Sequence, residues 1–144
     1  MGISTDVAND NIKKAATFKD FLINNQKNMI SVTLSEYLMQ LLKQKKLKRA
    51  HVIQDSGLEK AYVYQIFKGE KNPSRDKLIA LAFGLHLNIE ETQRMLKLGG
   101  CSELYARTKR DALILFCIFR KKSIYATDAA LYKWDLATLL PRDG

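Results

Sequence analysis

The segment KRAHVIQDSGLEKAYVYQIFKGEKNPS, which runs from Lys48 to Ser74, concentrates side chains that hydrogen-bond to bases and phosphates. Lysine, arginine, glutamine and asparagine reach phosphate oxygens or base edges, and tyrosine does so through its hydroxyl. The segment also reads as two short helices joined by a tight turn at a glycine. That arrangement allows one helix to lie in the major groove of DNA while the other braces it. The pattern therefore indicates recognition of duplex DNA.

No other residue pattern in the chain predicts catalysis or a bound metal. His51 and His86 are far apart in sequence, and neither neighbours a second metal ligand at a useful spacing. Cys101 and Cys117 stand alone, without a CxxC or a Cys/His spacing, so we expect reduced thiols. The chain also lacks G-x-S-x-G, a phosphate-binding glycine loop and H-E-x-x-H. We therefore expect that the protein is not an enzyme and uses no metal and no cofactor.

The positive charge of the chain is clustered around the two-helix segment. The formal net charge is +9, and between Lys43 and Arg75 nine Lys or Arg residues accompany three Asp or Glu residues. Basic proteins are attracted to polyanions because each neutralised phosphate releases a condensed counterion. A plain solvated basic surface would explain net charge alone, but the clustering favours a nucleic-acid partner.

Length and composition indicate a soluble globular protein. The 144 residues are 47% hydrophobic and 27% charged, which suits one domain with appendages. No apolar run approaches the roughly 20 residues that span a bilayer. The N-terminus has no apolar region of the kind found in signal peptides. We expect a cytoplasmic protein without a membrane partner.

Hydrophobic spacing and capping residues predict an all-α chain. Apolar residues at helical spacing predict an accessory helix over residues 12–25. Capping patterns predict further helices that begin at Thr33, with Glu36 completing a capping box, at Ser74, and at Asn88. The two helices of the opening segment are expected over residues 49–56 and 59–68, between the helices that begin at Thr33 and Ser74. The helix that begins at Asn88 is expected to end near residues 99–100.

The C-terminal part carries eight consecutive apolar residues, Ala112 to Phe119, which fit either a buried strand or a buried helix. The flanking residues and the scarcity of β-branched residues favour a helix. Its apolar side chains either complete the core of the monomer or form a dimer interface. Thr127 or Asp128 is expected to cap a last short helix. We thus expect three parts: 1–32, an N-terminal tail and accessory helix; 33–100, the DNA-binding helices; and 101–144, a C-terminal helical extension.

Several features of the two-helix segment occur together in one register. They are the inward Val52, the turn at Gly57, the buried pair Val63 and Ile66, the G-x-x-x-P-S of residues 69–74, and the helix LIALAFGLHLNIEE that follows. With these features the chain resembles the lambda repressor and Cro-like helix-turn-helix family, also called the XRE family, over roughly Thr33 to Leu98. The resemblance implies a lambda repressor-like five-helix DNA-binding domain, here with extra N- and C-terminal helices.

Two residues depart from the pattern of the family. Ile53 stands where the family usually has a small residue, so we expect a wider crossing of the two helices that meet there. Lys48 stands where the family commonly has Ser or Thr as the helix cap. Lysine is a poor cap beside the positive end of a helix dipole, although it could serve a nearby phosphate.

The resemblance implies a role for each exposed residue of the segment. The second helix is the recognition helix, with Lys60, Ala61, Gln65 and Tyr64 reading bases. Lysine donates to guanine O6 and N7, glutamine pairs with adenine, and alanine contacts a thymine methyl group. Phosphate contacts are implied for Arg49, Lys48, Tyr62, Lys68, Lys71, Asn72 and Arg75. For Tyr62 two roles are equally expected: its hydroxyl donates to a phosphate, or its ring covers the core.

The expected function is sequence-specific binding of double-stranded DNA as a repressor-like transcriptional regulator. A homodimer is expected, because operators read by such proteins are two-fold symmetric. The alternative is an antitoxin-like or adaptor protein that uses the same fold to bind a protein partner through its C-terminal helices. The placement of charge distinguishes the DNA-binding regulator from the adaptor protein. A DNA-binding protein keeps its cations on the recognition face, whereas an adaptor would leave that face free.

Overall fold

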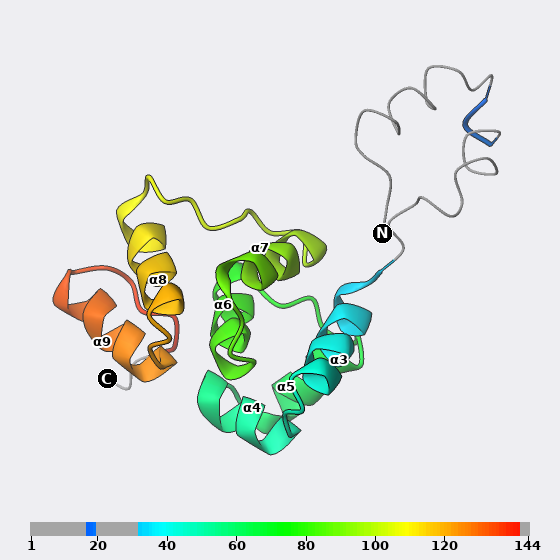
Figure 1. Cartoon of the computed structure of the whole chain (residues 1–144), viewed down its shortest axis with the longest axis horizontal. Helices are drawn as coiled ribbons and strands as arrows, with labels where there is room; N and C mark the ends of the chain where they lie inside the picture. Colours follow the sequence, from blue (N-terminus) through cyan, green and yellow to red (C-terminus); the bar gives the residue numbers. More distant parts are fainter. Residues whose placement is uncertain (1–16, 20–31, 142–144) are drawn as a thin grey trace. The chain divides into compact units, whose positions relative to one another are not determined.

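The computed structural model describes residues 17–19 and 32–141, and the regular structure in these ranges is helical, which confirms the all-α class. The chain divides into two compact units, Met1–Val32 and Thr33–Gly144. The predicted helix over residues 12–25 lies outside the described residues except for residues 17–19. The helices of the second unit are α3 (Leu34–Gln44), α4 (Arg49–Ser56), α5 (Lys60–Phe67), α6 (Arg75–Gly84), α7 (Ile89–Leu98), α8 (Lys109–Phe119) and α9 (Ile124–Lys133) (Figure 1).

The predicted caps of α3, α6 and α7 are confirmed. Thr33 and Ser74 accept from the amide three residues further on, at Glu36 and Lys77. The Glu36 carboxylate accepts from the Thr33 hydroxyl at 3.0 Å and not from the Thr33 amide, so the capping box expected at this end is only half formed. Asn88 and Glu91 form a complete capping box, with the Asn88 side chain 2.8 Å from the Glu91 amide and the Glu91 carboxylate 3.0 Å from the Asn88 amide. These bonds satisfy amide groups that have no partner inside the helix.

The predicted cap of the last helix is wrong. Ser123 caps α9, because its hydroxyl accepts from the Ala126 amide at 3.0 Å. Thr127 is instead buried one turn inside the helix, where its hydroxyl donates to the Ser123 carbonyl at 2.8 Å. Asp128 accepts from the backbone amides of Leu139 and Leu140 at 2.7 and 3.0 Å, which holds the C-terminal segment against α9.

Each helix of the second unit is followed by a residue in the left-handed backbone conformation. After α4, α5 and α7 it is a glycine, but after α3, α6, α8 and α9 it is Lys46, His86, Lys121 and Asp135, with φ between 53° and 58°. After α3, the Leu47 amide bonds to the Leu42 carbonyl at 3.1 Å. Such bonds satisfy the last carbonyls of a helix, at a backbone cost that a glycine avoids.

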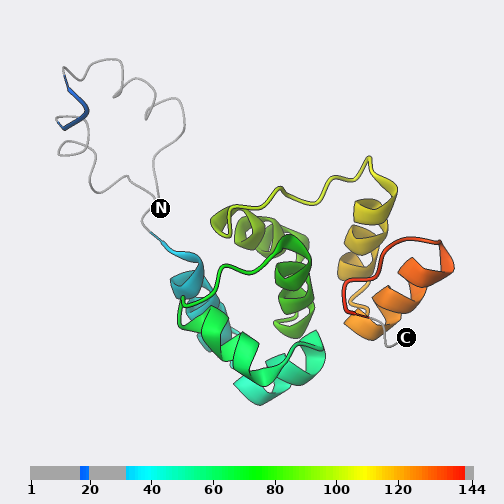
Figure 2. The same cartoon turned by 180° about the vertical axis from the view of Figure 1, so that it is seen from behind.

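The core is built around α6, whose residues 78–84 are all buried. α6 packs against α4, α7 and α9, and α8 packs against α7 and α9. In both views, α6 and α7 lie between the α3–α5 pair and the α8–α9 pair (Figures 1 and 2). The helices of the C-terminal extension therefore pack on the side of α6 that is remote from α5.

The crossing of α4 and α6 is close, contrary to the expectation from Ile53. A Cβ atom at Gly84 would lie 2.6 Å from the Val52 carbonyl oxygen and 2.7 Å from the Ser56 Cβ. The small residue that this contact needs is thus supplied by Gly84 of α6, while Ile53 stays half-buried. The larger side chain of Ile53 does not separate the helices, because the contact is made through Val52 and Ser56.

Two reciprocal ion pairs join the start of α6 to the start of α8. Arg75 donates to both carboxylate oxygens of Asp111 at 3.0 and 2.7 Å, and Arg110 donates to those of Asp76 at 3.0 and 3.1 Å. Bidentate pairs of this kind combine two charge-assisted hydrogen bonds with a fixed geometry. Each arginine also donates to backbone carbonyls, Arg75 to those of residues 102 and 103 and Arg110 to those of residues 137 and 138.

Asp111 is the most buried member of these pairs. Burial by itself raises the pKa of its carboxyl group, but hydrogen bonds from Arg75 and from the Tyr105 amide, together with the charges of Arg75 and Arg110, lower the pKa further than burial raises it. The folded protein therefore binds the proton more weakly than the unfolded chain, whose aspartates titrate near pH 3.9. The resulting stability is present above that pH and is lost as the pH falls through the lower pKa of the folded state.

We predict that Asp111→Asn lowers the free energy of unfolding at pH 7 by about 2 kcal/mol, because it leaves Arg75 without its ionic partner. The variant should also lose less stability than the parent between pH 5 and pH 2. Urea unfolding followed by circular dichroism at several pH values measures both effects. Glu70→Gln, at an exposed glutamate without an ion pair among the described residues, is the control. Parallel pH profiles for parent and Asp111→Asn would contradict the role of Asp111.

A second prediction concerns the left-handed helix ends. Gly100 has a φ of 72°, and a Cβ there would meet nothing within 4 Å, so Gly100→Ala tests backbone strain alone. It should lower the unfolding free energy by about 1 kcal/mol. Lys46→Gly should raise it by about 0.5 kcal/mol, because relief of strain exceeds the added entropy of the unfolded chain. Thermal melts measure both, and destabilisation by Lys46→Gly would contradict the argument.

Candidate nucleic-acid interface

The predicted two-helix segment is present with nearly its predicted bounds, as α4, a turn, and α5. Gly57 follows α4 with φ 71°, and Glu59 is the N-cap of α5. The Ser56 hydroxyl donates to the Ile53 carbonyl at 3.1 Å and accepts from the Leu58 amide at 3.2 Å, which closes the turn. Leu58 is buried within it. The angle between the two helices is therefore set by local hydrogen bonds and one apolar anchor.

The four predicted base-reading residues lie on one face of α5. Side chains three or four residues apart are neighbours on a helix surface. Lys60, Tyr64 and the C-cap Lys68 form one such row, and Ala61 and Gln65 form the row beside it. Lys60, Ala61 and Lys68 are exposed, whereas Tyr64 and Gln65 are half-buried. The opposite face carries Val63, Ile66 and Phe67, which are buried.

Among residues 101–141 of the C-terminal extension, neither α8 nor α9 packs on this face. α5 packs against α3, and the α8–α9 pair lies on the other side of α6 and α7 (Figure 2). An α-helix with its side chains is about 10–12 Å across, which is close to the width of the major groove of DNA.

Arg49 is held between α4 and α5 by aromatic rings. Its guanidinium carbon lies 5.7 Å from the centre of the Tyr64 ring and 5.8 Å from that of Phe67, and one terminal nitrogen donates to the Met39 sulfur at 3.5 Å. Its Nε is buried without a hydrogen-bond partner among the described residues. The remaining terminal nitrogen is free to meet a ligand at the start of α4.

The start of α4 has no side-chain cap. Lys48 takes the N-cap position with an extended backbone, and its side chain makes no capping hydrogen bond. The first amide groups of the helix consequently lack the partner that Ser or Asp would supply. Amides and dipole at such an end attract anions. Lys48 is exposed and adds its own positive charge there.

Tyr62 and the loop after α5 occupy the flanks of the interface. Tyr62 is half-buried and lies under Lys77, whose Nζ is 5.8 Å from the ring centre. This placement fits a ring that covers the core. Lys71 and Asn72 are exposed in the loop that leads to α6.

Arg75, for which a phosphate contact is expected, is engaged within the protein. Its guanidinium makes four hydrogen bonds, to Asp111 and to the carbonyls of residues 102 and 103, so it is a link between α6 and the C-terminal extension. Lys45, one of the nine clustered cations, is likewise paired with Glu91 at 3.0 Å. Sequence counting could not detect these pairs, because the acidic partners lie outside the basic segment.

Three residues near the interface were not found by sequence reasoning. Glu59 is exposed at the start of α5, beside Lys60. The Tyr125 hydroxyl donates to the Gln54 carbonyl of α4 at 2.7 Å. Leu140 lies so close to the turn that a Cβ at Gly57 would be 2.4 Å from its Cδ1. Glu59 was visible as an acid at a helix start, whereas no sequence pattern connects Tyr125 or Leu140 to α4.

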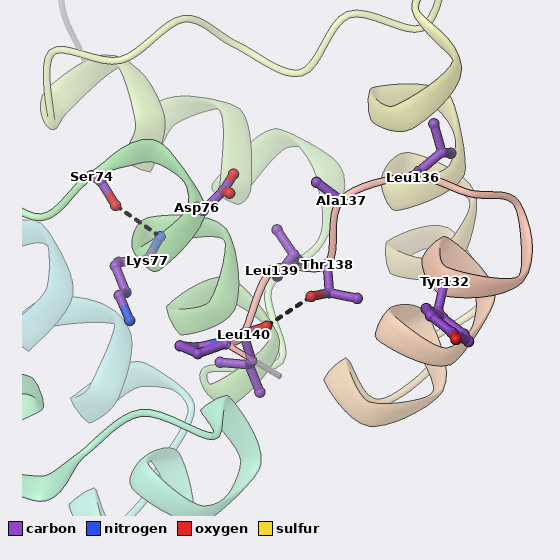
Figure 3. Close-up of a pocket in the computed structure, with 10 residues that line it drawn as sticks. Ser74, Asp76, Lys77, Tyr132, Leu136, Ala137, Thr138, Leu139 and Leu140 are labelled. Atoms are coloured by element: carbon purple, nitrogen blue, oxygen red, sulfur yellow. Dashed lines mark hydrogen bonds between the residues drawn. The ribbon is translucent and has the colours of Figure 1, made fainter. Parts of the chain in front are cut away.

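The segment that contains Leu140 runs beside the first turn of α6 (Figure 3). Together they line an open recess of about 610 Å3, in which the Ser74 hydroxyl faces the Lys77 amide and the Thr138 hydroxyl donates to the Leu140 carbonyl at 2.8 Å. This recess belongs to the attachment of the C-terminal segment, since its walls are that segment, the start of α6 and Tyr132 of α9.

Comparisons of the chain with models of protein families, with curated proteins and with solved structures gave no match. In residues 17–19 and 32–141, no group of three or more His, Cys, Asp or Glu is placed to hold a metal ion. No helix in the same ranges is both long and apolar enough to cross a membrane. The chemistry of the α4–α5 face is therefore the basis for a functional proposal.

We predict that Arg49 has a packing role that is separable from its charge. Arg49→Ala should lower the free energy of unfolding by about 1 kcal/mol, because it removes contacts with Tyr64 and Phe67. Arg49→Met keeps an unbranched apolar chain and removes the unpaired Nε, so it should leave stability within about 0.5 kcal/mol of the parent. Urea unfolding compares the two variants, and equal losses would show that the charge, not the packing, is what stabilises.

Proposed function

We propose that the protein binds double-stranded DNA sequence-specifically through α4 and α5, as a repressor-like transcriptional regulator of the lambda repressor and Cro-like kind. The observation that carries the proposal is the exposed face of α5, where Lys60, Ala61, Tyr64 and Gln65 lie together beside unpaired cations. A helix with this width and these side chains has the means to enter the major groove and read base edges.

The α5 face offers a distinct contact for each kind of base. Lys60 donates to guanine O6 and N7, Gln65 pairs with the N6 and N7 of adenine, and Ala61 contacts a thymine methyl group. Glu59 adds an acceptor for the N4 amino group of cytosine. Tyr64 stays against Arg49 and Lys60, so its ring orients two cations at the edge of the groove.

Phosphates are held on both sides of α5 in this proposal. Arg49, Lys48 and the uncapped amides of α4 meet the backbone at one side. Lys68, Lys71 and Asn72 meet it at the other side, after α5. Arg75 is left out because it is paired with Asp111. Contacts of this kind orient the protein on the duplex without reading its sequence.

We also propose that two copies bind a two-fold symmetric operator. α8 buries Ile114, Cys117 and Ile118 in the core of the unit but exposes Phe116, which is 52% accessible and lies one turn from the half-buried Leu113. An exposed apolar face of this kind suits the apolar centre of a homodimer interface.

The second candidate is an antitoxin-like or adaptor protein that binds a protein partner. The observation that favours it is the number of exposed aromatic residues in the C-terminal extension: Tyr105, Phe116, Phe119, Tyr125, Tyr132 and Trp134. Aromatic residues dominate the energetics of protein interfaces. Complexes made through them survive high salt, whereas phosphate contacts weaken steeply with salt.

Selection from a random duplex library, followed by salt titration, tests the first candidate. Gln65→Ala should relax the preference at one base position by about 1–3 kcal/mol. Arg49→Met should weaken binding to all sequences alike and reduce the slope of log K against log salt by about 1. Lys133→Gln, at an exposed lysine of α9, is the charge-matched control and should bind as the parent does.

The proposal fails if the parent selects no sequence, or if Gln65→Ala and Arg49→Met both bind selected duplexes as tightly and as selectively as the parent. A stable complex with another protein that persists in 1 M salt, without duplex binding, would support the second candidate instead.

A further inference from the structure

A second cavity, of about 690 Å3, lies away from the α4–α5 face. Its walls come from the C-terminal end of α6, the turn and first residues of α7, the C-terminal end of α8, and the turn before α9. Pockets of this size hold small organic ligands, and they typically combine an apolar wall with a few polar groups. The residues that line this cavity likewise form an apolar part and a charged part.

The apolar part of the cavity ends at an exposed ring. Phe83, Leu87 and Ile118 form walls that are themselves buried, and Phe119 at the edge is 72% accessible. Leaving a phenylalanine ring in water costs free energy that a ligand lying against it would recover. The wall thus favours a ligand with an apolar body.

The charged part of the cavity is positive. Lys45 is paired with Glu91 at 3.0 Å, and His86 is bonded to Asp55 at 2.9 Å. Lys121 and Lys122 form no ion pair with any described residue, and Glu90 is the remaining acid on the wall.

The two unpaired lysines are held by a closed turn. Lys121 has the left-handed conformation, and the Lys122 amide bonds to the Cys117 carbonyl at 2.9 Å. The lysine backbones are therefore positioned before a ligand arrives, which reduces the entropy lost on binding.

We propose that this cavity binds a small organic anion that consists of an apolar, ring-sized body and one carboxylate or sulfonate group. The body would lie against Phe83, Leu87, Ile118 and Phe119, and the anionic group would lie between Lys121 and Lys122. A neutral ligand would leave the two lysines without a counter-charge, and a cation would be repelled by them. The proposal does not depend on DNA binding, because none of its residues belongs to the α4–α5 face.

The test uses 8-anilinonaphthalene-1-sulfonate, a fluorescent anion with an apolar body, and N-phenyl-1-naphthylamine, the same ring system without the sulfonate. The full chain should bind the sulfonate in a one-to-one complex. Lys121→Gln combined with Lys122→Gln should weaken that binding about fivefold and leave the neutral dye within about twofold of the parent. The matched control combines Lys43→Gln with Lys133→Gln, two exposed lysines outside the cavity, and should bind as the parent does.

Phe119→Ser provides an independent variant, because the side chain is exposed and its replacement leaves the core intact. It should weaken both dyes. In amide chemical-shift spectra, titration with the sulfonate should move the signals of Ala82, Leu87, Ile118 and Phe119 first. Equal loss of sulfonate binding in the two double variants, or shifts centred on residues outside the cavity, would overturn the proposal.

Discussion

The crossed ion pairs between α6 and α8 are the interaction on which the arrangement of the second unit depends. Each helix carries the dipeptide Arg-Asp in its first turn, at 75–76 and at 110–111, and each arginine binds the aspartate of the other helix. Since both arginines also donate to backbone carbonyls, the same two side chains hold the loop before α8 and the C-terminal segment. Four charged residues thus attach the C-terminal extension to the central helix at one place.

That attachment affects both the exposed face of α5 and the cavity between the ends of α6 and α8. With their starts joined, α6 and α8 lie near each other at their ends as well, where Phe83 and Ile118 share the wall of one cavity. The α8–α9 pair is kept on the far side of α6 from α5, so the α5 face stays exposed (Figure 1). Tyr125 and Leu140 meanwhile reach the α4–α5 turn, so the extension supports the proposed interface from behind.

Much of the local structure could be predicted because its causes lie within a few residues. The bounds of α4, the turn at Gly57 and the capping box of Asn88 and Glu91 follow from short-range hydrogen bonds. Predictions failed where a neighbouring residue or the packing of a whole helix decided the outcome. Thr127 has the chemistry of a cap, but Ser123 takes that position and leaves Thr127 inside the helix. Phe119 belongs to an apolar run, yet it is exposed because only one side of α8 meets the core.

The amino-acid sequence by itself determined the helical class, the caps of α3, α6 and α7, and the set of side chains on each face of α5, because helical periodicity and capping are local properties. Only the tertiary structure decided which cations are free. Arg75 and Lys48 look alike in a count of charges, but Arg75 is bound by Asp111 and Lys48 remains exposed. An ion pair joins residues that the fold brings together, and no spacing along the chain reveals it.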